Sequence, residues 1–275
     1  MKLTEDKKSY VTRSQLAHDL RKLGLTKGQT VMLHASVRSL GWVVGGPDQV
    51  IHALMDVLGP AGTLMMYVGW EEAPYYLDKW PPERKKLYLD ECPPFDPATS
   101  RAVRKWSILT EYLRTWPGAY RSVHPTASCA AIGKLASWIT RDHPLQYGYG
   151  PGSPFGKLCD IAGKVLLLGS DLAHVTIIHY AEHIADILGK RVVRYQMPLI
   201  INGERKWVHM EEYDTGEGIK HWPHEEDYFE VIMKELLKGG GAQTGLVGAG
   251  VSHLLEVRSI VDFSRSWLEE VFGVQ

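Results

Sequence analysis

Short aliphatic runs and longer amphipathic stretches follow one another along the chain. The runs, which are typical of buried strands, are residues 30–34, 62–68 and 164–168. The stretches with apolar side chains at helical spacing are residues 12–24 and 48–58, and each ends at a glycine. Strand, helix and strand in that order predict a βαβ unit. We therefore expect an α/β fold with a mixed sheet flanked by helices.

The stretch from Gly169 to Leu188 predicts a helix that combines a core face with acid–base chemistry. Ser170 or Asp171 is placed to cap its start. Its apolar residues at helical spacing are Ile177, Ala181, Ile184, Ala185 and Leu188. Its other face carries His179, Glu182, His183 and Asp186. A histidine and a carboxylate at i, i+3 can hydrogen-bond and transfer protons, although a solvated polar face has the same pattern.

Two regions interrupt the regular pattern. From about residue 70 to 97 the chain is rich in proline, charge and aromatic residues, which predicts a long surface loop. This excursion begins with Glu71, Glu72 and Tyr76. From about residue 204 to 227 acidic residues outnumber basic ones, and Glu211, Glu212 and Asp214 belong to this acidic segment. Charge runs of this kind are commonly solvated faces, but several carboxylates around one cleft would attract a cation.

Composition narrows the class of protein. The chain has 275 residues, is 44% hydrophobic, and carries 31 Lys+Arg against 32 Asp+Glu, for a net charge of −1. This balance gives no general attraction to nucleic acid or to an anionic membrane. No apolar run approaches the ~20 residues of a membrane span. The charged N-terminus lacks a signal-peptide core, and the three cysteines are widely spaced without a C-x-x-C motif, so we expect a reduced, cytoplasmic protein.

An ordered set of segments resembles the aminoglycoside 3-N-acetyltransferases, an antibiotic N-acetyltransferase family distinct from the GNAT fold. The segments are HASVRSLG (34–41), GTLM (62–65), WEEAPY (70–75), PFDPA (94–98), RSVHPTAS (121–128), GSP (152–154), LLLG (166–169), VTIIHYAE (175–182) and SIVDFSRSW (259–267). Together they span roughly residues 14 to 270. The resemblance implies the antibiotic N-acetyltransferase-like fold and one acetyltransferase domain over residues 1–275.

The resemblance also implies a reaction and its ligands. Acetyl-CoA would donate an acetyl group to the 3-amino group of a 2-deoxystreptamine aminoglycoside, conferring antibiotic resistance. His179 matches the family's catalytic histidine and would act as general base, with Glu182 beside it and Glu212 as a further carboxylate near it. An imidazole can take the proton of the attacking amine, and a carboxylate on its other nitrogen stabilises the imidazolium.

The remaining site residues follow from the same matched segments. Those matching cofactor-side segments are Ser36, Val37, Arg38, Ser39, His124, Ser128, Ser153 and Phe155. Those expected to bind the polycationic acceptor are Glu71, Glu72, Tyr76, Glu211 and Asp214. For each cofactor-side residue taken singly, a structural role explains the sequence equally well. No metal is implied, and the assembly is expected to be a monomer or a homodimer.

Other readings remain open at this stage. The letters H-x-x-E-H at residues 179–183 match an inverted zincin motif, in which two histidines bind zinc and the glutamate is the base of a peptidase. Departures from the family pattern around residues 71–73 and 215–217 leave open an amine acceptor other than an antibiotic. A relative that binds its ligands without turnover is a third alternative. Direct transfer is favoured over an acyl-enzyme because no cysteine lies in a recognisable nucleophile motif.

Overall fold

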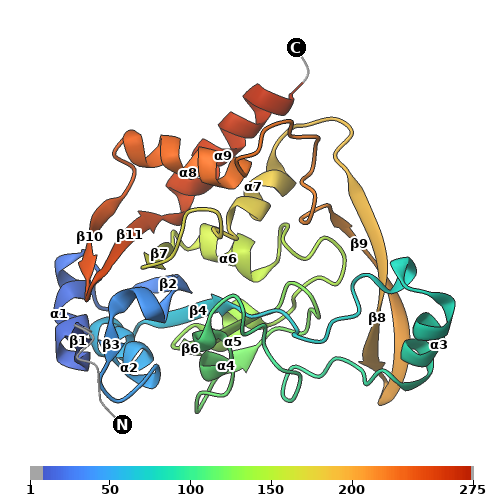
Figure 1. The fold of residues 1–275 in the computed structure, drawn as a ribbon, viewed down its shortest axis with the longest axis horizontal. Coiled ribbons are helices and arrows are strands. Elements are labelled where there is room, and N and C mark those ends of the chain that lie inside the picture. The colour runs from blue at the N-terminus through green and yellow to red at the C-terminus, as the bar shows by residue number, and fades with distance from the viewer. Residues whose placement is uncertain (1–8, 274–275) are drawn as a thin grey trace, which may run out of the picture.

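The computed structural model describes residues 9–273, and a mixed sheet lies at its centre (Figure 1). In this part of the chain the sheet has seven strands in the order β10-β11-β7-β2-β4-β6-β5. The strands are β2 (Thr30–Ala35), β4 (Thr63–Tyr67), β5 (Tyr120–Arg121), β6 (Cys129–Gly133), β7 (Lys164–Leu168), β10 (Gln243–Val247) and β11 (Gly250–Glu256). Strand β2 pairs in parallel with β4 and β7, whereas the β6 and β11 pairings are antiparallel. The expected mixed sheet is therefore confirmed.

Helices cover both faces of this sheet (Figure 1). One face packs against α1 (Arg13–Lys22), α2 (Asp48–Leu58) and α4 (Ile108–Arg114). The other packs against α5 (Ala136–Thr140), α6 (Pro154–Asp160), α7 (Ile178–Ile184), α8 (Tyr228–Lys238) and α9 (Val257–Phe272). Successive strand side chains alternate between the faces, so Val31 and Leu33 join the first core and Met32 joins the second. Burial on both faces explains the continuous apolar runs in the sequence.

A long hairpin and the excursion form a separate apolar cluster beside the sheet. The hairpin consists of β8 (Val192–Ile201) and β9 (Glu204–Tyr213), and the excursion contains a 3-10 turn (Leu77–Lys79) and α3 (Pro82–Glu91). Trp70 and Phe95 pack with Met197 in this cluster. The backbone N–H of Phe95 donates to the carbonyl of Pro198 at 2.7 Å, which fastens the end of the excursion to the hairpin (Figure 1).

Smaller elements complete the description. The N-terminal β1 (Tyr10–Val11) pairs in parallel with β3 (Trp42–Val43), and a 3-10 turn (Val37–Leu40) lies between β2 and β3. No helix within residues 9–273 combines the length and the apolar character needed to cross a bilayer.

The sequence predicted the βαβ unit correctly, because β2, α2 and β4 have the expected extents and β2 and β4 are parallel. The prediction of one helix from residue 169 to 188 is wrong. Gly169 has a φ of +59°, and Ala185 has extended backbone angles, so the helix is limited to Ile178–Ile184. Asp171 hydrogen-bonds His174 instead of capping a helix, and Leu188 is 69% exposed.

The excursion also differs from the expected loop, because it contains α3. Pro82 occupies the first turn of this helix, where a missing backbone N–H costs nothing. None of its side chains is buried, so it has no apolar stripe that sequence periodicity could detect.

Candidate active site

Helix α7 presents His179 with its ring held in place. The Nδ1 atom of His179 lies 2.6 Å from Oε2 of Glu182, one turn further along the helix. The Glu182 side chain is 1% exposed, and its other oxygen accepts a hydrogen bond from the Tyr228 hydroxyl. With Nδ1 engaged by Glu182, Nε2 is the nitrogen left to serve a ligand. This is the geometry of a histidine whose tautomer is set by a carboxylate.

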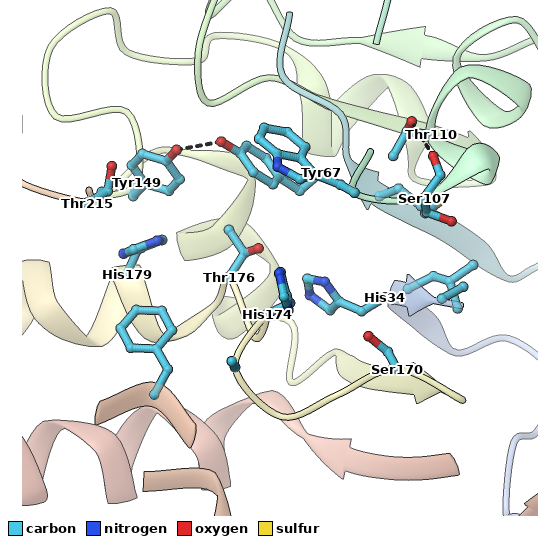
Figure 2. Close-up of a pocket in the computed structure, with 16 residues that line it drawn as sticks. His34, Tyr67, Ser107, Thr110, Tyr149, Ser170, His174, Thr176, His179 and Thr215 are labelled. Carbon is cyan, nitrogen blue, oxygen red and sulfur yellow. Dashed lines mark hydrogen bonds between the residues drawn. The ribbon is translucent and has the colours of Figure 1, made fainter. Parts of the chain in front are cut away.

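His179 lines a central cavity of about 310 Å³ at the carboxyl ends of β2 and β4 (Figure 2). The rings of Tyr149 and Phe229 flank the imidazole, with centroids 4.9 Å and 4.8 Å from it. Figure 2 shows the hydroxyl of Tyr149 bonded to that of Tyr67, and the distance is 2.7 Å. Aromatic walls with a few fixed polar groups are typical of a small-molecule site.

A cationic groove of about 660 Å³ continues from one end of the central cavity. The two share Ala35, Trp106, Ser107, Ser170 and His174 in their linings. Arg38, Arg104 and Lys105 line the groove, and within residues 9–273 none of these three side chains forms an ion pair. Arginine and lysine side chains without a carboxylate partner are well suited to bind phosphate groups.

The other end of the central cavity opens into an acidic region. A cavity of about 350 Å³ shares His179, Thr215 and Phe229 with the central one. Its acidic lining residues are Glu217, Glu225, Glu226 and Asp227. A further cavity of about 270 Å³ shares Gly216 and Glu217 with it and adds Tyr76, Asp78 and Asp214. His179 therefore lies between a cationic end and an acidic end of one connected space.

The structure brings only half of the expected cofactor residues together. Ser36, Val37, Arg38 and Ser39 line the cationic groove. The other four, His124, Ser128, Ser153 and Phe155, are at most 1% exposed and lie outside it.

The contacts of these four buried residues are of the kind that stabilise the fold. His124 Nδ1 accepts from the N–H of Ala127 at 2.8 Å, and the Ser128 hydroxyl donates to the carbonyl of Gly69 at 3.2 Å. Ser153 caps α6, and the ring of Phe155 stacks behind Tyr149 at 5.3 Å. They do not line the groove, so these contacts favour a structural role, and their part in cofactor binding stays a prediction.

The expected acceptor residues are also divided. Tyr76 and Asp214 line the acidic region. Glu71 accepts the backbone N–H of Arg104 at 2.7 Å and so fixes the loop of the cationic groove. Glu72 is exposed and lies outside the linings of the cavities described above. Glu211 is bound by Arg194 at 2.6 Å, on the outer face of β9.

Glu212, expected near His179, is paired with the other histidine of α7. Its Oε1 is 2.8 Å from Nε2 of His183, and the two side chains are 2% and 4% exposed. The carboxylate that holds His179 is Glu182, whereas Glu212 pairs with His183, and a catalytic role of Glu212 stays a prediction. The sequence could not reveal this, because β9 brings Glu212 to α7 only in the folded chain.

The pairing also bears on the H-x-x-E-H motif. His179 and His183 are each committed to a different carboxylate, and both oxygens of Glu182 are occupied. Within residues 9–273 no three histidine, cysteine or acidic side chains converge in a way that could hold a metal ion. The motif therefore does not present two histidines to one shared ligand position.

Several lining residues were not among the predicted site residues. Burial lowers the pKa of His34 to about 4, so this ring at the end of β2 is neutral at neutral pH. His174, paired with Asp171 at 2.5 Å, lines both the central cavity and the cationic groove. Arg104 and Lys105 form a basic pair beside Trp106, a signal that could have suggested an anion site.

Comparison with known proteins agrees with this geometry. The family model described as aminoglycoside 3-N-acetyltransferase matches residues 32–269. Aminoglycoside N(3)-acetyltransferase III of Pseudomonas aeruginosa is 45% identical, over 95% of each chain. Aminoglycoside N(3)-acetyltransferase VII of Streptomyces paromomycinus is 43% identical, over 96% of this chain and 93% of its own.

Solved structures give the same result. Aminoglycoside acetyltransferase AAC(3)-Xa superimposes with a TM-score of 0.93 at 41% identity, over 96% of this chain and 94% of its own. AAC-IIIb, solved in binary complex with CoASH, superimposes with a TM-score of 0.90 at 45% identity, over 97% of this chain and 99% of its own. This chain therefore belongs to the aminoglycoside 3-N-acetyltransferase family and is an acyltransferase.

Proposed function

We propose that this protein transfers the acetyl group of acetyl-CoA to the 3-amino group of a 2-deoxystreptamine aminoglycoside, with His179 as general base. The observation that carries the proposal is the position of the His179–Glu182 pair between a cationic groove and an acidic region. A nucleotide-bearing anion and a polycation would approach the same imidazole from opposite ends.

The cationic groove suits the phosphates of coenzyme A. Arg38 on the 3-10 turn and Arg104 with Lys105 on the facing loop provide three positive charges. The pantetheine arm would then extend into the central cavity past Trp106 and His174, which line both spaces. A relative 45% identical to this chain has been solved with CoASH, which supports the same cofactor here.

The acidic region suits an aminoglycoside, which carries several ammonium groups. Glu217, Asp214 and the run from Glu225 to Asp227 surround this space. Carboxylates around one cleft raise the local concentration of a polycation and slow its release. The relative AAC-VIa, 35% identical to this chain, has been solved bound to sisomicin, which supports the same class of acceptor here.

The chemistry follows from the free Nε2 of His179. The acceptor ammonium first releases one proton to bulk water, and Nε2 takes a second proton from the resulting amine as the nitrogen attacks the thioester carbonyl carbon. The C–N bond forms, the C–S bond breaks, and the imidazolium returns its proton to the departing thiolate. Glu182 stabilises the imidazolium through Nδ1. Direct transfer is favoured because none of the three cysteines, all within the described residues, lines the central cavity.

Release of CoA thiol from acetyl-CoA tests the proposal, measured over gentamicin, tobramycin, neomycin and apramycin with EDTA present. Turnover with some of them is expected, and expression in a susceptible bacterium should raise resistance to the same compounds. If folded protein that binds CoA releases no thiol with any compound of the panel, an aminoglycoside acceptor is rejected. The acceptor would then be another amine, or the protein would be a relative that binds its ligands without turnover.

A further inference from the structure

Tyr228, the first residue of α8, makes a contact to which the proposed acyl transfer assigns no role. Its hydroxyl donates to Oε1 of Glu182, whereas Oε2 of the same carboxylate lies 2.6 Å from His179 Nδ1. The Tyr228 side chain is buried, at 7% exposure. Burial and the neighbouring Glu182 both raise the pKa of Tyr228, so the phenol keeps its proton and acts as a donor. Both oxygens of Glu182 are thus satisfied, each by a different element of the fold.

The Tyr228 side chain also contacts the loop that lines the acidic region. The backbone of Gly218 passes directly over the ring, since a Cβ built there would lie 3.0 Å from Cε1 and 3.2 Å from the hydroxyl. Gly218 has a φ of +80°, a conformation that glycine adopts without strain.

Arg191 holds this loop against Tyr228. Its Nε donates to the carbonyl of Gly218 at 2.9 Å, and its Nη2 donates to the carbonyls of Glu217 and Lys220. Its backbone N–H donates to Ile219 at 2.8 Å. The segment from Glu217 to Lys220 therefore has a fixed position, and Glu217 and Gly218 both line the acidic cavity.

We propose that Tyr228 is a positioning residue that sets the charge distribution on Glu182 and couples the acceptor-side loop, residues 215–220, to His179. The coupling runs from the backbone of Gly218, which packs against the Tyr228 side chain, through the Tyr228 hydroxyl to Glu182 and then to the imidazole. A donor on Oε1 draws negative charge away from Oε2, so Glu182 holds the imidazolium less tightly than a bare carboxylate would. The position of the acceptor-side loop would thus influence the basicity of His179. The inference rests on the proposed function, because it assigns Tyr228 to the same reaction.

The substitution Tyr228→Phe removes the hydroxyl and keeps the ring, which packs among Phe229, Trp267 and Phe272. The His179–Glu182 pair should then retain a proton to higher pH, whichever of the two groups carries it. We expect the acidic limb of the pH profile of kcat/KM to move up by about one unit, so that kcat/KM at pH values below that limb falls roughly tenfold, the effect of one hydrogen bond to a charged group. An NMR titration of the His179 imidazole should show a shift of the same sign without turnover.

Tyr180→Phe is the matched control. Tyr180 follows His179 on α7, but its ring lies against Gly156 of α6, and it lines none of the cavities around His179. This variant should keep the wild-type profile. A Tyr228→Phe profile that overlays the wild type, or a uniform loss at every pH with lowered thermal stability, would overturn the inference and leave only a structural role.

Gly218→Ala tests the loop end of the coupling, because the added methyl group would force the loop off Tyr228 without changing any charge. It should move the acidic limb in the same direction by a smaller amount and raise KM for the acceptor. A raised KM with an unmoved limb would refute the coupling. If the wild-type protein itself releases no thiol with any aminoglycoside, the proposed function fails, whereas the His179 titration still decides the role of Tyr228.

Discussion

Helix α7 carries two histidines one turn apart. Each is paired with a carboxylate, but the two pairs have different surroundings. His179 and Glu182 lie on one helix, and the imidazole lines the cavity that joins the cationic and acidic ends. His183 meets Glu212 of β9, and both side chains are sealed from solvent. The same two residue types therefore occur in opposite environments. Access to the cavity, and not the pairing itself, separates the proposed catalytic pair from the buried structural pair.

The difference also concerns hydrogen bonding. Both oxygens of Glu182 have hydrogen-bond partners. In the described chain neither Oε2 of Glu212 nor Nε2 of His183 has one, although Nε2 lies 2.8 Å from Oε1 of Glu212. Burying a carboxyl oxygen without a hydrogen bond costs free energy, and the adjacent imidazole offsets part of that cost. We therefore expect damage to the first pair to reduce turnover and damage to the second to reduce stability.

The largest effect is expected from His179→Ala. Loss of the general base should lower kcat by roughly 10³-fold, within the range typical of such groups. Affinity for acetyl-CoA should stay near the wild-type value, because the cationic groove does not include His179. Thiol release and calorimetric titration of CoA measure the two quantities separately.

The control for this variant is Tyr180→Phe on the same helix, which should keep wild-type turnover. Wild-type kcat in His179→Ala would show that the proton leaves by another route. A large loss of CoA affinity would instead place His179 in the cofactor site.

The second effect concerns Glu212→Gln, which neutralises the sealed carboxylate while keeping its shape. Loss of a buried charge partner should lower the free energy of unfolding by roughly 2–4 kcal/mol. The thermal midpoint should fall by several degrees, while kcat of the folded protein changes less than tenfold. Calorimetry and thiol release below the transition measure these changes. A stable variant without activity would reverse the comparison and restore Glu212 to the chemistry, as the sequence suggested.

Sequence reasoning found the first pair and missed the second for a physical reason. The i, i+3 spacing of His179 and Glu182 is local, so helical geometry alone brings them together. His183 and Glu212 meet only because the β8–β9 hairpin packs beside α7, and no local pattern encodes that. The same limit hid Tyr228. For the same reason the matched segments could not show that His124, Ser153 and Phe155 are buried outside the cationic groove.

The fold was predictable to a similar extent. The strands at residues 30–35, 63–67 and 164–168 are buried on both faces, so their apolar runs identify them. Helix α3, without a buried face, left no signal, and α7 is shorter than its polar and apolar spacing indicated. Periodicity therefore located the central strands and the helices of the N-terminal half, and it did not identify α8, β11 and α9, which build much of the second core.

A third pair consists of two histidines and contains no carboxylate. His124 and His143 stack at 4.9 Å, and their hydrogen bonds go to backbone groups and hydroxyls. Burial lowers the pKa of His143 to about 4 and that of His124 well below its usual value. Above pH ~6.5 both the folded and the unfolded chain hold these rings neutral. Between that pH and about 4 only the unfolded chain takes up protons, so stability falls as the pH falls.

His143→Gln should reduce this pH dependence. The wild-type protein should lose roughly 3 kcal/mol through His143 between pH ~6.5 and 4, and the variant should lose correspondingly less. Urea unfolding at several pH values measures the slope, and His18→Gln on the exposed face of α1 serves as control. An unchanged slope in His143→Gln would mean that other groups govern acid unfolding.

The smallest effect is expected from Glu211→Gln, the neighbour of Glu212 on β9. Its carboxylate points to the opposite face, where Arg194 and the Tyr147 hydroxyl bind it at the protein surface. Exposed ion pairs contribute little to stability, so the thermal midpoint should move by about a degree or less. Because Glu211 lines none of the acidic cavities, KM for the acceptor should also be unchanged. A several-fold rise in that KM would return Glu211 to the acceptor site, where the sequence placed it. The pair of variants on adjacent residues then decides whether burial or position along β9 determines what a carboxylate does.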